Sequence, residues 1–164
     1  MLEGLDGFDW ASVEHAYGPA VEVPAWLRAI AKEAKRGKAF SSFVSAVNHQ
    51  GTATPAALPV VPFLLELVAV GAGPIADVTV LLGDFAAAGD HTNVLAFGAE
   101  GIDAHANVGA LMGAVGAGLE QFRALTTHDD PKVRAAATVP LAMLGDRDGK
   151  TESHARRSCA RAPR

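Results

Sequence analysis

Prolines and glycines interrupt an otherwise apolar, alanine-rich sequence at short intervals, and three prolines fall between Val47 and Val68 alone. Helices favour proline at their first position and glycine just beyond their last one. Alanine supplies 33 of the 164 residues and is the best helix former, whereas only ten residues are aromatic. This spacing predicts an all-α protein of short helices that turn back on one another at proline and glycine.

The expected helices bury apolar side chains that recur at helical spacing. They cover residues 9–17, 24–36, 38–50 with Gly51 as the cap, a turn at 54–58, then 62–70, 74–88, a long helix at 103–128, and a helix from Pro131 that Asp130 caps and Pro140 kinks. Antiparallel pairs of such helices bury only part of their apolar faces alone, so we expect them to stack side by side as a short α-solenoid.

Charge divides the chain into two expected parts, a helical repeat domain at 1–146 and a basic, disordered tail at 147–164. The tail carries six Lys/Arg against two acids, whereas residues 39–122 contain seven acids and no lysine or arginine. A nucleic-acid-binding face needs clustered cations. We therefore expect no nucleic acid to bind the body of the domain.

The location predicted for the protein is the cytoplasm, without contact with a membrane. No secretory signal is visible at the N-terminus, and the single cysteine, Cys159, excludes an internal disulfide. Residues 56–76 are the nearest approach to a membrane span, with Glu66 as their only charge, but prolines and glycines interrupt them.

Two segments resemble HEAT-repeat proteins. Residues 129–145, DDPKVRAAATVPLAMLG, resemble the second helix of a HEAT repeat at Asp130, Pro131, Val133, Arg134, Ala137, Leu144 and Gly145, but not at Pro140. The N-terminal half is similar to a group of bacterial HEAT-like proteins with the pattern AYG…VP…HQGT…VPFLLEL, here at 16–18, 23–24, 49–52 and 61–67. The resemblance covers residues 9–70 and 105–146. It implies a right-handed α-solenoid that works by protein contact, and a chain shorter than most members.

The first candidate site is the segment His49, Gln50, Gly51 and Thr52, together with Arg134. An imidazole beside an amide could bind a ligand or carry a proton. The structural interpretation is that His49 and Gln50 satisfy backbone groups at a helix end. For Arg134 we expect a contact that holds neighbouring helices, with Asp129 or Asp130 as its partner.

The alternative function is nucleotide binding or an enzyme built on it. Gly71, Gly73 and Ala76 satisfy the G-x-G-x-x-A dinucleotide pattern, with Asp90 as the ribose-binding acid. That interpretation requires a strand before Gly71 and backbone amides that face a pyrophosphate, and Pro74 supplies no amide.

The other reactive side chains do not form a recognisable catalytic combination in the sequence. We therefore expect no catalytic residues, no metal and no cofactor. Asp90-His91 and Asp103-x-His105 could offer metal ligands, but aspartates also cap helices. Cys159 has no partner in sequence. The function that the sequence favours is a protein–protein interaction scaffold, such as an adaptor or a toxin-neutralising protein, and its solenoid ends could self-associate.

Overall fold

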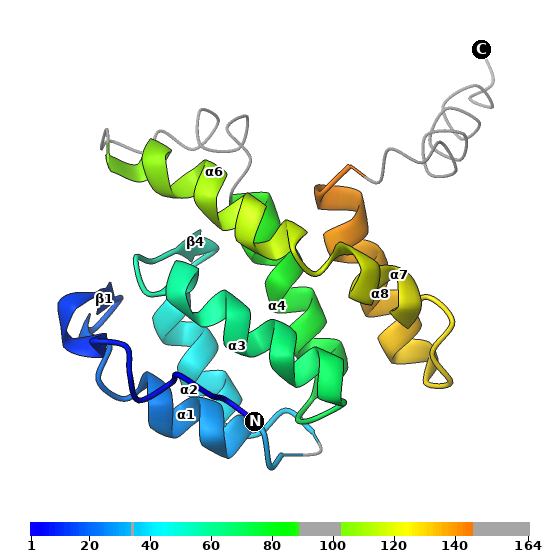
Figure 1. The fold of residues 1–164 in the computed structure, drawn as a ribbon, viewed down its shortest axis with the longest axis horizontal. Helices are drawn as coiled ribbons and strands as arrows, with labels where there is room; N and C mark the ends of the chain where they lie inside the picture. The colour runs from blue at the N-terminus through cyan, green and yellow to red at the C-terminus, as the bar shows by residue number, and fades with distance from the viewer. Residues whose placement is uncertain (34, 89–102, 146–164) are drawn as a thin grey trace.

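The computed structural model describes residues 1–33, 35–88 and 103–145. These residues are mostly helical, as predicted (Figure 1). The helices are α1 (Val23–Ile30), α2 (Lys38–Val47), α3 (Ala57–Val70), α4 (Ile75–Ala88), α6 (Asp103–Gly116), α7 (Leu119–Leu125) and α8 (Pro131–Met143). The expected tail at 147–164 and the boundary at 146 lie outside the described residues.

Two antiparallel ribbons of two-residue strands were not predicted, although the mostly helical fold is compatible with the all-α expectation. The first ribbon pairs β1 (Glu14–His15) with β2 (Gly18–Pro19). It replaces most of the helix expected at 9–17, of which only the 3₁₀ turn η1 (Trp10–Ser12) forms, capped by Asp9 as expected. A two-residue hairpin loop brings the chain back before a helical turn can close.

The second ribbon pairs β3 (Asn48–His49) with β4 (Thr52–Ala53) and ends α2 earlier than predicted. Gln50 and Gly51 form its turn with φ of 52° and 81°. Positive φ at both central residues defines the type I′ turn of tight hairpins, in which glycine is favoured. Gly51 is therefore a turn residue and not the helix cap that we expected.

Helix α3 runs through two prolines that were predicted to separate helices. Pro59 is its third residue, where the missing N–H would have no intrahelical partner. Pro62 lies inside the helix and removes one hydrogen bond, to the Leu58 carbonyl. Seven of the fourteen residues of α3 are buried apolar side chains, and their packing outweighs that loss.

Glycines set the contacts between helices. The predicted 103–128 helix is divided into α6 and α7. Gly118 lies between them, and a Cβ there would lie 2.3 Å from Cδ2 of Leu65, so the position has room only for glycine. In α4, a Cβ at Gly83 would lie 2.6 Å from Cγ1 of Val139 and 3.0 Å from the nitrogen of Pro140. The absence of a side chain at Gly83 therefore allows α4 and α8 to pack closely.

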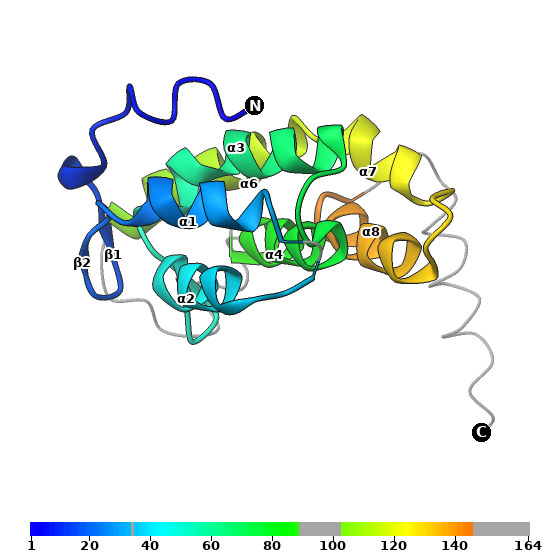
Figure 2. The ribbon, with the colours of Figure 1, turned by 90° about the horizontal axis from the view of Figure 1, so that it is seen from below.

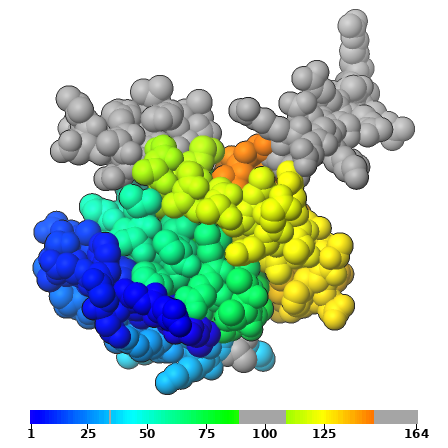
Figure 3. Space-filling view, in the orientation of Figure 1, coloured from blue at the N-terminus to red at the C-terminus, as the bar shows by residue number. Residues whose placement is uncertain are grey.

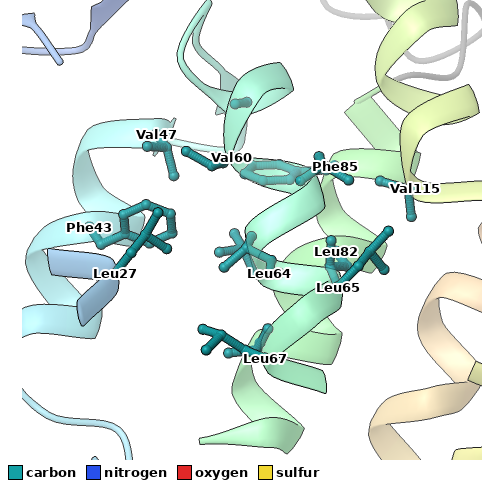
Figure 4. Close-up of a cluster of buried hydrophobic side chains, with 14 of the residues drawn as sticks. Leu27, Phe43, Val47, Val60, Leu64, Leu65, Leu67, Leu82, Phe85 and Val115 are labelled. Carbon is teal, nitrogen blue, oxygen red and sulfur yellow. The ribbon is translucent and has the colours of Figure 1, made fainter. Parts of the chain in front are cut away.

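The helices form two layers around one apolar core. In Figure 2, α1 lies above α2, α3 above α4 and α7 above α8, and each of these pairs is in contact. Figure 4 shows Leu64 of α3 between Phe43 of α2 and Leu82 of α4, and all three are fully buried. The core is continuous from the first helices to Leu141 of α8.

The N-terminal segment, residues 1–8, crosses the surface of α3 as a strap (Figure 3). Leu2 and Leu5 are buried in the core. The Leu2 N–H donates to Oε1 of Glu66 at 2.8 Å, and Nε1 of Trp10 donates to the Leu5 carbonyl at 2.7 Å. Glu66 thus has a structural role. The stretch 56–76 is divided between α3 and α4, and no described helix is both long and apolar enough to cross a bilayer.

Candidate interaction site

The loop of the first ribbon carries an exposed tyrosine. Tyr17 is 64% exposed, although its hydroxyl lies 2.9 Å from Oγ of Ser45 on α2. The ribbon is joined to the rest of the fold by backbone bonds, from the Ala16 N–H to the Ala46 carbonyl and from the Ala56 N–H to the Glu14 carbonyl, both 3.0 Å. These bonds fix the ribbon to the fold, so that the Tyr17 ring is exposed to solvent in a defined position.

The buried side chain of His15 supports the same loop from the side of the protein interior. Its side chain is buried and stacks on Trp26 of α1, with ring centroids 5.7 Å apart and 27° between the planes. Nδ1 accepts the Tyr17 N–H at 3.1 Å, so the ring proton sits on Nε2, which lies 3.4 Å from Oε2 of Glu22. His15 is therefore a structural residue that positions Tyr17 and Trp26.

His49, the central residue of the sequence-predicted site, lies on the other side of Tyr17. The two rings meet edge to face, with centroids 5.5 Å apart and planes at 84°. Nδ1 lies 3.1 Å from the Ser45 carbonyl oxygen, which can only accept, so Nδ1 carries the proton. Among the described residues Nε2 has no hydrogen-bond partner.

The arrangement does not activate a serine. A base-activated nucleophile needs its hydroxyl bonded to the nitrogen of the base. Here the Ser45 hydroxyl is bonded to Tyr17, and His49 instead binds the Ser45 carbonyl.

A shallow depression opens beside Tyr17, with a volume of about 480 Å³. Two aromatic side chains and three serines line it: Tyr17, Trp26, Ser41, Ser42 and Ser45. Of the residues that the structure describes, none with a charged side chain is among them. We call this surface the Tyr17–Trp26 depression. This surface was not predicted from the sequence, although Tyr17 belongs to the AYG motif and packs against His49 of the HQGT motif.

The remaining residues of the HQGT segment shape the second ribbon. Gln50 and Gly51 make its turn, and Thr52 pairs with His49 across it. The Oδ1 atom of Asn48 beside them is buried without a hydrogen-bond partner.

The glycine-rich segment proposed for a dinucleotide is a turn between two helices. It follows helix α3 where the dinucleotide pattern requires a strand. Gly71, at φ 68°, is the left-handed cap of α3, and the Ala72 N–H donates to the Leu67 carbonyl at 2.9 Å. A Cβ at Gly73 would lie 2.8 Å from the Ile30 carbonyl oxygen, so this glycine faces protein. Asp90 lies outside the described residues.

Arg134 is remote from the depression, in the first turn of α8. Its Nη1 donates to the carbonyls of His128 and Asp129, at 2.7 and 2.8 Å. The partner is therefore the backbone of the preceding loop and not an aspartate side chain, and Asp130 instead caps α8 by accepting the Lys132 N–H at 2.8 Å. Arg134 stabilises the start of its own helix.

The candidate metal ligands cannot be placed together. Asp90, His91 and Cys159 lie outside the described residues, and Asp103 is the first residue of α6. In the part of the chain that the structure describes, no three His, Cys, Asp or Glu side chains gather where they could hold a metal ion. Comparison with protein-family models, with curated proteins and with solved structures finds none that matches this chain.

Proposed function

We propose that this protein is a non-catalytic protein-interaction module of the HEAT-repeat type, a short right-handed α-solenoid that serves as an adaptor. Three helix pairs, α1 with α2, α3 with α4 and α7 with α8, support the solenoid part of the proposal, together with two layers and a continuous core. In stacked repeats each pair completes the burial of its neighbour, and function lies on the exposed surface.

The observation that carries the proposal is the Tyr17–Trp26 depression. Tyrosine and tryptophan provide large contact area at small cost in conformational entropy, and serine provides adaptable hydrogen bonds. Tyrosine and tryptophan are enriched in protein-binding surfaces, where charged residues are depleted relative to the rest of the surface. The ribbon and His15 hold Tyr17 in place before a partner arrives, which lowers the entropic cost of binding.

The experiment compares three forms of the chain as bait for proteins of the native host, with capture quantified by mass spectrometry. The forms are the parent, Tyr17→Ala and Val70→Ala. Val70 is 57% exposed and does not line the depression, which makes its variant the matched control. At least one protein should be captured by the parent and by Val70→Ala but lost with Tyr17→Ala. Equal capture by all three forms would refute the proposal, provided that circular dichroism shows the same helix content.

A further inference from the structure

Two residues that line the Tyr17–Trp26 depression each carry a hydrogen-bond donor without a partner among the described residues. The indole Nε1 of Trp26 and the hydroxyl of Ser42 have no hydrogen-bond partner among the described residues, and neither atom is sealed from solvent. The other tryptophan, Trp10, differs because its Nε1 is bonded to the Leu5 carbonyl in the interior. The residues that line the depression therefore include two aromatic rings and two donors without a partner among the described residues.

The chemistry of the depression excludes three of the recurring ways in which proteins bind peptides. Addition of a strand needs an exposed edge, and the strands of the adjacent ribbon are only two residues long. Recognition of a phosphorylated or acidic segment needs arginine or lysine, and the described lining has neither. An amphipathic helix needs a row of apolar anchor sites over successive turns, whereas the wall on α2 is formed by Ser41, Ser42 and Ser45.

Recognition of a polyproline II segment, another of these modes, fits the lining. A polyproline II segment has no internal hydrogen bonds, so its backbone carbonyls are free to accept, and its proline rings pack on aromatic side chains. Tyr17 and Trp26 offer the aromatic faces, and Trp26 Nε1 and Ser42 Oγ offer the donors. A segment of this kind is already extended in the free state, so a shallow surface can bind it at low entropic cost.

We propose that the partner docks an uncharged, proline-rich segment in polyproline II conformation on the Tyr17–Trp26 depression. This proposal rests on the interaction function proposed above and specifies the chemistry of the partner.

The test is an NMR titration of the full ¹⁵N-labelled chain with a short, uncharged proline-rich peptide, acetylated and amidated at its ends. The chain has two tryptophans, so two indole N–H signals report separately. The chemical shift of the Trp26 indole N–H should change in proportion to the fraction of chain bound, and that of the Trp10 indole N–H should not change. A peptide of equal length with glycine and serine in place of proline should move neither signal.

Variants identify the contacts. Tyr17→Ala should weaken binding about 30-fold, as expected for a residue that dominates an interface. Trp26→Phe keeps a ring but loses the donor and should weaken binding about 2- to 10-fold. Val70→Ala should bind like the parent. An unmoved Trp26 signal at millimolar peptide, or an equal response to the glycine–serine peptide or to a phosphopeptide, would overturn the proposal.

The two proposals fail in different ways. If host proteins are lost with Tyr17→Ala but proline-rich peptides do not bind, the interaction function stands and the peptide class is wrong. If neither experiment depends on Tyr17, both proposals are wrong.

Discussion

The close packing of α4 on α8 predicts opposite effects for the same substitution at two helical glycines. A methyl group at Gly83 would lie 2.6 Å from Cγ1 and 3.1 Å from Cβ of Val139, and 3.0 Å from the nitrogen of Pro140. Carbon atoms pack favourably at about 3.5–4.0 Å. At Gly113 of α6, the same methyl group would have no neighbour within 4 Å among the described residues, apart from the backbone of its own helix.

The magnitude follows from two contributions to the free energy of unfolding. Alanine in place of glycine inside a helix stabilises by about 1 kcal/mol. This gain applies to both variants. Inserting a methyl group into a well-packed contact costs about 1–3 kcal/mol, and this cost applies only to Gly83→Ala. We therefore expect Gly113→Ala to be more stable than the parent, and the two variants to differ by about 1–3 kcal/mol.

The assay is urea unfolding followed by circular dichroism at a helix-sensitive wavelength, with both variants and the parent under the same conditions. A chain of this size changes its Tm by about 2–4 °C per kcal/mol, so thermal unfolding provides a second measurement. Adding Val139→Ala to Gly83→Ala removes the nearest atom and should restore part of the loss. If Gly83→Ala stabilises the chain as much as Gly113→Ala, the described approach of α4 to α8 is incorrect.

Three further substitutions test other parts of the fold. Desolvation raises the pKa of Asp84 above its ordinary value of 3.8. The folded state therefore keeps this proton to a higher pH than the unfolded chain does. As a result, the free energy of unfolding decreases as the pH rises from the pKa of the unfolded chain through that of the folded state. Asp84→Asn should therefore gain stability over the parent as the pH rises from about 4 to neutrality, and an equal difference at pH 3 and pH 7 would contradict the shift. Gly51→Ala should destabilise by about 1 kcal/mol in urea unfolding, because an L side chain strains the left-handed conformation; no loss would argue against the type I′ turn. Phe43→Ala, at a fully buried position, should lose about 3–5 kcal/mol in the same assay, and a loss below 1 kcal/mol would mean that the site is not core.

Much of the helical arrangement could be predicted because local signals and packing agree. Asp130 caps α8 and Pro131 begins it, as the sequence indicates, and α4 begins one residue after Pro74. Gly71 ends α3, as the sequence indicates, and adopts the left-handed conformation. In each case one residue type satisfies a requirement of the adjoining helix end, so no knowledge of distant contacts was needed.

The errors occur where distant contacts override local preference. Pro62 would end an isolated helix, but burial of the neighbouring α3 side chains keeps the helix intact. Tyr17 fits a helical pattern with Trp10, yet the chain forms a ribbon whose bonds reach Ala46 and Ala56, about 30–40 residues away. The depression was missed for the same reason, because Trp26 and the serines of α2 meet Tyr17 only in the folded chain.

The strap has a consequence for the order in which the molecule is completed during synthesis. Leu2 and Glu66 are 64 positions apart. A ribosome that adds about 5–20 residues per second therefore needs about 3–13 s to produce the acceptor after the donor. During that interval Leu2 and Leu5 lack the surface that buries them, and they are available to a chaperone. The strap can close only after α3 exists, so residues 1–8 reach their final place only once a segment about 60 positions later has been synthesised.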